Sequence, residues 1–240
     1  MGLPKIDQPL FELIVPSTGK KVSYRPFTVK EEKILLIAQE SKEIEQVVLA
    51  IKQIINNCVH DVDPDTMPVF DLEYIMLCIR AKSVNNEVNF TIKDPDTEED
   101  VALSLNINEI HVTHNPDHSK EIELSKEYSI IMRYPTVDGL KALMPEEVDG
   151  KEESESQIVF RSMIACIDSL VNNNTDEVFK FSDFSDKEIT EFVDQFTSDT
   201  VTGMQKFFKT VPHMSCAIAY KDNTGKDKTF NMEGMETFFT

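Results

Sequence analysis

The chain has 240 residues, of which 40% are hydrophobic and 8% aromatic, and its 24 basic and 43 acidic side chains give a formal net charge of −19. This length and hydrophobic content are enough for one large or two small globular domains, so the composition excludes an intrinsically disordered chain. The acidic balance argues against binding to nucleic acid and to anionic membrane surfaces, because both ligands attract clustered Lys and Arg.

The sequence also lacks the features of a membrane or secreted protein. It contains no run of 18 apolar residues, and its first residues show no basic region followed by an apolar stretch, so we expect neither a membrane span nor a secretory signal. The cysteines Cys58, Cys78, Cys166 and Cys216 are widely spaced in apolar segments, and none forms a CxxC pair. We expect four reduced, mostly buried thiols in a reducing cytoplasm.

The first predicted elements are a hairpin, a corner and a helix. Residues 10–15 and 21–25 are short segments separated by a turn sequence, which indicates an antiparallel pair. Pro26 ends the second strand because proline has no N–H to donate. Thr28 and Glu31 have the spacing of a capping box, which predicts a helix that begins after Thr28.

Two more helices follow. The second helix is predicted from about Lys42, because apolar residues recur at the helical period. They are Ile44, Val47, Val48, Ile51, Ile54, Ile55 and Cys58. Since β-branched residues are weak helix formers, packing must hold this helix. Asp71 is the predicted N-cap of a third helix that runs from Leu72 to about Ala81.

The pattern then changes to the period of two that is typical of strands. Apolar residues alternate with polar ones over residues 88–92 and 101–107, which predicts a second hairpin. Shorter strands are predicted around residues 110–112 and 122–124. A longer strand is predicted over residues 128–134, where Pro135 follows it.

An acidic segment interrupts the chain after a short predicted helix over residues 136–144. Residues 146–156 (EEVDGKEESES) contain six acids and one lysine and no apolar period, which indicates a solvated linker. We therefore predict an N-terminal α+β lobe over residues 1–145 and a C-terminal helical lobe over residues 157–240 that ends in a β-hairpin. A single extended domain is the alternative.

The C-terminal part is predicted to be mainly helical. A long helix is predicted over residues 156–172, a capping box between Ser185 and Glu188 begins another, and a further helix is predicted over residues 200–211. Residues 214–232 are predicted to form a third hairpin. The fold class is therefore α+β, with helical core segments and small antiparallel β-hairpins.

Motifs for phosphate and calcium binding are incomplete. Residues 17–20 (STGK) resemble the end of a phosphate loop but lack its first glycine. Acids alternate from Asp94 to Asp100 as in a calcium loop, but the sixth residue is Glu99 rather than glycine and the twelfth is Leu105 rather than glutamate. We interpret these acids as residues of a hairpin tip, and we predict no cofactor.

Three histidines form the remaining cluster of potential metal ligands. His111, His114 and His118 lie within eight residues and could ligate zinc. The spacing is that of a loop rather than of one helix face, and no cysteine is near, so we interpret them as solvated loop histidines. A metal-dependent enzyme is a remote alternative. The prediction is a protein that is not an enzyme, with no catalytic residue, no metal and no small-molecule substrate.

Two aromatic segments are candidate interaction sites. They are Tyr24, Arg25, Pro26 and Phe27 at the predicted corner, and Phe238 and Phe239 close to the last residue. Apolar side chains near a chain end need a surface to cover them. The corner can equally be a purely local structural feature, and the two phenylalanines can fold back on the helices of their own chain.

Four short stretches resemble one known protein family. Residues 1–6 (MGLPKI), 16–21 (PSTGKK), 24–27 (YRPF) and 29–33 (VKEEK) resemble the baseplate hub subunits and baseplate hub assembly proteins of T4-like contractile-tailed phages. The acidic, Trp-free composition and the length are similar too. Relatives sometimes carry paired cysteines in their hairpins, which this chain lacks, so no metal site is carried over.

The resemblance implies a role in building the phage tail. The implied function is that of a non-catalytic baseplate hub protein that contacts other hub and tail proteins and stays in the virion as a structural subunit. The alternative implied by the same resemblance is an assembly chaperone. Such a protein would act transiently in the host bacterial cytoplasm and be absent from the mature virion.

Overall fold

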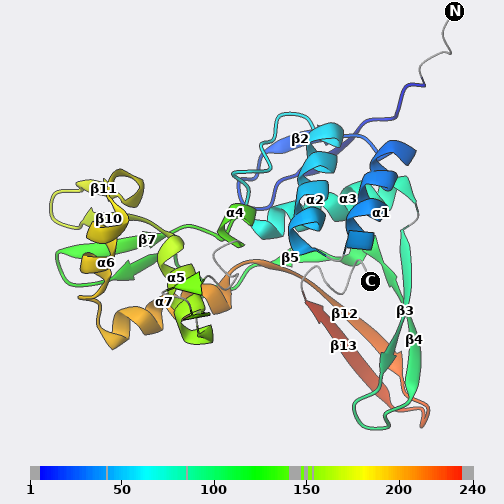
Figure 1. The fold of residues 1–240 in the computed structure, drawn as a ribbon. Coiled ribbons are helices and arrows are strands. Elements are labelled where there is room, and N and C mark those ends of the chain that lie inside the picture. Colours follow the sequence, from blue (N-terminus) through cyan, green and yellow to red (C-terminus); the bar gives the residue numbers. More distant parts are fainter. Residues whose placement is uncertain are drawn as a thin grey trace, which may run out of the picture. The chain divides into compact units, whose positions relative to one another are not determined.

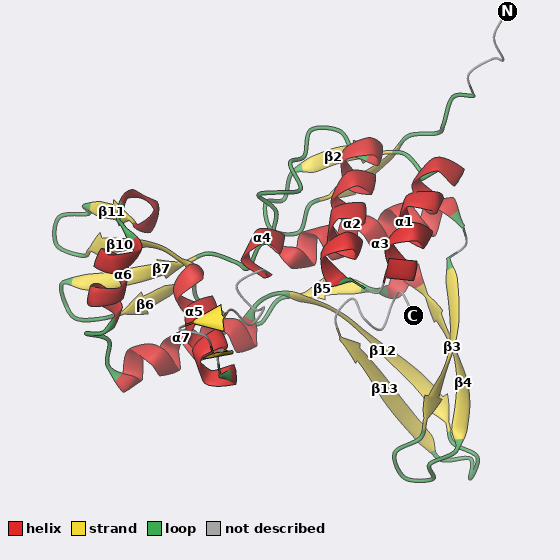
Figure 2. Ribbon diagram, in the orientation of Figure 1, coloured by secondary structure: helices red, strands yellow, loops and turns green. Residues whose placement is uncertain are grey.

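The computed structural model describes residues 6–41, 43–84, 86–140, 147–148, 151–152 and 154–233 (Figure 1). The chain forms two compact units. The first unit consists of residues 1–113 and 213–240, and the second unit consists of residues 114–212. Helices and small antiparallel sheets make up both units (Figure 2), which confirms the predicted α+β class.

The first unit begins with the predicted hairpin. β1 (Phe11–Ile14) pairs with β2 (Lys21–Tyr24), and Phe11 lies opposite Tyr24. Gly19 in the turn has a φ of +68°, a conformation that residues with a side chain rarely adopt. Alternate residues of both strands are buried, as expected for a hairpin that covers a core with one face.

Three helices follow this hairpin: α1 (Val29–Ser41), α2 (Ile44–Cys58) and α3 (Val69–Ser83). α2 packs against both α1 and α3. From Ile51 onward the predicted apolar stripe of α2 faces the core, where Ile54, Ile55 and Cys58 are almost completely buried. Full burial of one such aliphatic side chain stabilises the fold by roughly 1.5–3 kcal/mol. The packing therefore compensates for the weak helix propensity of this β-branched stripe.

The predicted start of the third helix is wrong by three residues. α3 begins at Val69, after Pro68, so Asp71 lies inside the first turn and is not the N-cap. Its buried carboxylate accepts hydrogen bonds from the amide (3.0 Å) and the hydroxyl of Ser17, in the turn between β1 and β2. Asp71 thus joins the hairpin to α3 across 54 positions of sequence, a contact that no local pattern reveals.

Two long hairpins complete the first unit. β3 (Glu87–Lys93) pairs with β4 (Asp100–Asn106), and β12 (His213–Lys221) pairs with β13 (Asp227–Glu233), both as predicted. β5 (His111–Thr113) adds a third strand beside β12. Figure 1 shows both hairpins extending away from the helices, with their tips close together. The core at their base consists of Leu77, Ala81, Leu105, Ile107, Ile110, Met214, Cys216 and Met232.

The second unit is a four-stranded sheet with helices packed on it. The strands lie in the order β11 (Val178–Lys180), β10 (Ile167–Asn172), β7 (Tyr128–Met132) and β6 (Glu121–Glu123). The main helices are α5 (Glu155–Ala165), α6 (Asp186–Val193) and α7 (Ser198–Thr210). The core consists of Ile122, Ile130, Met132, Met163, Cys166, Ile167, Val193, Met204 and Phe207.

The helix predicted over residues 156–172 is in fact two elements. α5 ends at Ala165, and the following residues form β10, which pairs with β7 on one side and with β11 on the other. The spacing of Ile167, Leu170 and Val171 suits either period. The hydrogen bonds of two neighbouring strands decide in favour of the strand, and those neighbours are distant in sequence.

The predicted acidic linker contains structure, and the unit boundaries differ from it. Within residues 146–156, β8 (Glu147–Val148) pairs with β9 (Lys151–Glu152), and α5 begins at Glu155. Of the short helix predicted over residues 136–144, α4 covers Val137–Leu140, and residues 141–146 lie outside the described residues. The units divide near residues 113 and 213 because β12 returns to pair with β5.

The cysteines match a further expectation. All four cysteines are free, three are buried and Cys78 is half-buried. Burial raises the pKa of Cys58, Cys78 and Cys166 to about 11, so these thiols remain protonated at neutral pH. Among the described residues, the helices are all too short or too polar to cross a membrane.

Candidate interaction site

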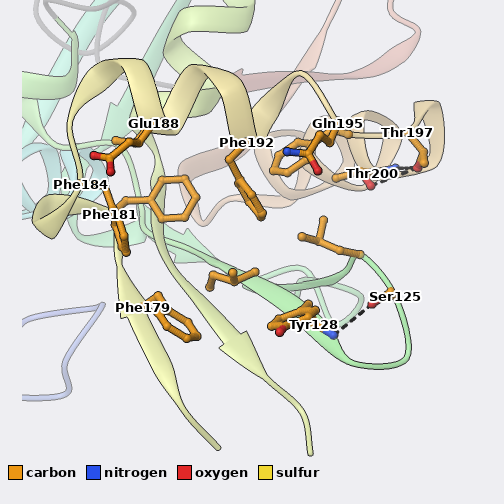
Figure 3. Close-up of a pocket in the computed structure, with 14 residues that line it drawn as sticks. Ser125, Tyr128, Phe179, Phe181, Phe184, Glu188, Phe192, Gln195, Thr197 and Thr200 are labelled. Atoms are coloured by element: carbon orange, nitrogen blue, oxygen red, sulfur yellow. Dashed lines mark hydrogen bonds between the residues drawn. The ribbon is translucent and has the colours of Figure 1, made fainter.

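An aromatic pocket of about 540 Å³ lies in the second unit. One side is formed by β7, β10, β11 and the turn before β7. The other side is formed by η3 (Phe181–Asp183), α6 and the start of α7 (Figure 3). The apolar residues that line this aromatic pocket are Leu124, Tyr128, Leu170, Phe179, Phe181, Phe184, Ile189, Phe192 and Phe196.

The local sequence explains why the aromatic rings converge. The capping box between Ser185 and Glu188 begins α6, as predicted, so that Ile189, Phe192 and Phe196 follow at spacings of three and four residues. Phe192 makes edge-to-face contacts with Phe196, at a centroid distance of 5.4 Å, and with Phe181 at 6.0 Å. These contacts are favourable for aromatic pairs and give the pocket a firm wall.

The polar side chains that line the pocket are engaged in local structure. The Ser125 hydroxyl accepts hydrogen bonds from two backbone amides of its own turn. Glu188 accepts from the amide and hydroxyl of Ser185, and the Gln195 amide donates to the Glu191 carbonyl. Thr197 caps α7 by accepting from the Thr200 amide. These groups shape the backbone around the pocket.

The segment that carries most of the pocket is strongly acidic. Residues 181–199 contain six Asp and Glu residues and one lysine, Lys187. The hydrogen bonds from Ser185 lower the pKa of Glu188, so this carboxylate at the pocket stays ionised at neutral pH. An apolar pocket carried by an acidic segment attracts a ligand that combines apolar with basic groups.

The acids that resemble a calcium loop, from Asp94 to Asp100, lie at the tip of the β3–β4 hairpin, where a lysine of the β12–β13 hairpin forms ion pairs with two of them. Asp94, in the turn between β3 and β4, is completely buried. The Lys228 ammonium, on β13, donates to both oxygens of Asp94, at 2.6 and 2.8 Å. It also lies 3.0 Å from a carboxylate oxygen of Asp96 and 3.2 Å from one of Asp222. The interpretation as hairpin-tip acids therefore agrees with the structure, in which the cation is a side chain of the same chain.

The hydrogen bonds at the tips fix the ionisation of these groups. Lys228 is the main cause that lowers the pKa of Asp94, and the Tyr220 hydroxyl adds a hydrogen bond of 2.8 Å. Hydrogen bonds from Thr224 and from the Lys226 amide lower the pKa of Asp222 to about 2. Asp94 raises the pKa of Lys228 in turn. All three groups are therefore charged at neutral pH and tie the tip of one hairpin to the other.

The histidine cluster does not form a metal site among the described residues. His111 and His114 are exposed, as expected for solvated histidines. The interpretation of His118 as a solvated loop residue is wrong, because its ring stacks on Tyr134 at 5.5 Å and its Nδ1 lies 2.8 Å from the Thr210 hydroxyl. Burial lowers the pKa of His118, so its imidazole is neutral at pH 7. This histidine packs between Tyr134, which follows β7, and the end of α7.

The predicted corner is integrated into the first unit. Tyr24 and Pro26 are buried, whereas Arg25 and Phe27 keep part of their surface. Arg25 pairs with the buried carboxylate of Glu31 at 3.1 Å. Burial alone would raise the pKa of Glu31, but the hydrogen bonds from Arg25 and from Thr28 together lower it to about 2. The corner is thus a structural junction, and an interaction through its exposed part stays a prediction.

The other predicted interaction residues, Phe238 and Phe239, lie outside the described residues. Sequence reasoning did not find the aromatic pocket. A signal for it was present, since five of the 15 phenylalanines lie within residues 179–196. Their spacing is irregular because a strand, a short 3-10 helix and α6 each contribute some of them.

Comparison with known protein families identifies the chain. A family model described as "T4 bacteriophage base plate protein" matches residues 8–240. Comparisons with curated proteins and with solved structures found no match. The family match covers both compact units and includes three of the four stretches that carry the resemblance, within residues 16–33. The chain therefore belongs to the T4 bacteriophage base plate protein family and is a structural protein of the phage tail baseplate.

Proposed function

We propose that the protein is a subunit of the baseplate hub that acts through protein–protein contacts, without catalysis, and that remains in the virion. The observation that carries this proposal is the family match over residues 8–240. The hub, as distinct from the rest of the baseplate, is favoured by the resemblance of residues 1–33 to hub subunits and hub assembly proteins.

The geometry of the second unit supports a role in binding. The aromatic pocket is built from packed rings, and the polar side chains Ser125, Glu188, Gln195 and Thr197 at its edge are committed to backbone hydrogen bonds. A catalytic site needs polar groups that are positioned toward a substrate. An aromatic concavity, in contrast, is the usual seat of the residues that dominate a protein–protein interface.

The hub location can be tested by cross-linking mass spectrometry of purified phage particles. A subunit of the hub is expected to cross-link mainly to proteins of the central hub and of the tube end that the hub adjoins. The exposed lysines of both units, such as Lys126, Lys187 and Lys221, provide reactive sites. Cross-links confined to peripheral baseplate proteins would contradict the hub assignment, although the family membership would stand.

A further inference from the structure

We propose that the aromatic pocket of the second unit is the docking site for a polypeptide segment of a partner protein, whose large apolar side chains are flanked by Lys and Arg. This inference rests on the proposed function, in which the chain acts through contacts with other baseplate proteins. It adds the position of one contact on this chain and the chemistry of the partner.

The pocket is both large and accessible. Its volume of about 540 Å³ lies within the roughly 300–1,000 Å³ of protein sites that enclose a ligand. Phe184 lines it and is 43% exposed, although phenylalanine is usually buried. An exposed aromatic ring at the mouth of an apolar pocket is a feature of interaction sites, because burial of the ring against a partner releases water from both surfaces.

The charge of the segment that forms one side of the pocket favours a basic partner. Six acids and one lysine lie within residues 181–199, which carry η3, α6 and the start of α7. The lysine, Lys187, is already paired with Glu191 at 3.7 Å. The net negative charge repels nucleic acid and anionic lipid headgroups and attracts Lys and Arg side chains. Glu188 is the acid that lines the pocket itself. The occupant that suits both the aromatic rings and the acidic segment is an apolar segment with basic flanks.

Two alternative occupants, the last residues of this chain and a second copy of the chain, fit the pocket less well. Residues 234–240 contain Phe238 and Phe239, but they also contain Glu236 and no Lys or Arg. A second copy of the chain would bring another acidic surface, because residues 114–212 contain 20 Asp and Glu residues against ten Lys and Arg residues. Like charges at a rim disfavour association, so a different, basic protein is the expected partner.

Photo-cross-linking during infection tests the occupant directly. The full-length protein is produced in infected cells with p-benzoylphenylalanine at position 184, or at position 178 as the control. Val178 suits this purpose because it is 53% exposed on β11, where the next residue, Phe179, lines the pocket and alternate side chains point to opposite faces. The expected result is a dominant cross-link from position 184 to one peptide of another phage protein, with apolar residues flanked by Lys or Arg.

Several results would overturn the inference. The first is a cross-link yield at position 184 that does not exceed the yield at position 178. The second is a cross-link from position 184 to residues 234–240 or to another part of this chain, and the third is a cross-link to an acidic peptide. A small molecule that copurifies with the wild-type chain and is lost on Phe184→Asp would also overturn it, because the pocket would then hold a ligand of another class.

Affinity measurements separate the contribution of the aromatic pocket from that of the acidic charge. The cross-linked peptide is synthesised and its binding to the purified full-length chain is measured by fluorescence anisotropy. Phe184→Asp is expected to weaken binding at least tenfold, whereas Val178→Asp changes it less than twofold. The double variant Glu191→Lys, Asp194→Lys reverses charge at two exposed positions and is expected to weaken binding at least fivefold in low salt, and less in high salt. Equal effects of Phe184→Asp and Val178→Asp would contradict the pocket as the site.

The controls keep this inference distinct from the hub proposal. Phe184 and Val178 are both exposed, so both aspartate variants are expected to fold, and circular dichroism of the purified chains verifies this. Cross-linking of purified particles through lysines does not depend on Phe184. A chain found in the hub but with no partner in the pocket would overturn the inference alone.

Discussion

At the scale of single residues, Lys228 shows how a pattern that resembles a metal loop acquires a different role. The alternating acids between Asp94 and Asp100 are those of a calcium loop without its essential glycine and glutamate. The structure brings Lys228 and Asp222 to these acids from a hairpin more than 100 residues later. A lysine ammonium then balances the buried carboxylates, so the tips of two hairpins are joined by charge-assisted hydrogen bonds.

Removing this ammonium is expected to destabilise the first unit. Lys228→Met leaves the carboxylates of Asp94 and Asp222 buried without their cation, which is much more costly than the loss of an exposed charge. Lys226→Met is the matched control, because Lys226 is exposed in the same turn and contributes only its backbone amide to Asp222. Denaturant unfolding should show a clearly lower midpoint for Lys228→Met and a near wild-type midpoint for Lys226→Met.

The pH dependence of the stabilisation by the ionised Asp222 follows from its lowered pKa. The pKa of Asp222 is about 2 in the folded chain, against about 3.9 for an unfolded aspartate. The stabilisation is therefore complete above pH 3.9 and is lost as the pH falls through 2. The difference in the free energy of unfolding between Asp222→Asn and wild type, which compares a neutral side chain with the ionised one, should accordingly be the same at pH 7 and at pH 5. A difference that fades between these pH values would contradict the charged pairing.

At the scale of elements, the periodic segments could be predicted from the sequence, and the exceptions have physical causes. The apolar stripe of α2 and the capping box of α6 are local signals, and both elements form where these signals lie. β10 was predicted as a continuation of α5 because its apolar spacing suits a helix as well as a strand. Its pairing with β7 and β11 is a non-local interaction that overrides the local pattern.

The candidate site was less predictable than the fold for the same reason. The capping box locates α6, but the pocket also needs β7, β10 and η3, and these come together only through the sheet order. Likewise, the packing of His118 depends on Tyr134 and Phe207, which are distant in sequence. Sequence patterns locate elements, whereas a pocket depends on the arrangement of several elements.

The orientation of α2 is open to a direct mutational test. Ile51→Asp places a charge without a partner at a position that is 6% exposed, so we expect a loss of about 3–5 kcal/mol in the free energy of unfolding. Leu49→Asp on the same helix is the control, because Leu49 is 58% exposed, and its cost should stay below about 1 kcal/mol. Thermal or denaturant unfolding distinguishes the two, and equal losses would show that the described helix face is wrong.

At the scale of the whole molecule, the chain is acidic in both units. Residues 1–113 and 213–240 contain 23 Asp and Glu residues against 14 Lys and Arg residues, and residues 114–212 contain 20 against ten. The boundary between the units was not predicted at its observed position. The composition shift at residues 146–156 is a local signal, while the return of β12 to β5 that assigns the last hairpin to the first unit is not.

An acidic protein of the baseplate is expected to contact basic surfaces of its neighbours, because complementary charges favour encounter. Like charges oppose association between copies of the chain itself. The aromatic pocket is one place on the chain where such a contact can form. The family places the chain in the phage tail. The pocket, of which one side is carried by the acidic residues 181–199, provides one surface that an apolar, basic segment would cover.

Quantitative mass spectrometry of purified phage particles, beside the lysate of infected cells, tests the central claim most directly. A structural subunit of the baseplate is expected in the particles, at a fixed ratio to the other baseplate proteins that persists after repeated purification. A chain that is abundant in the lysate and absent from purified particles would contradict the structural role in the virion and would favour the assembly chaperone instead.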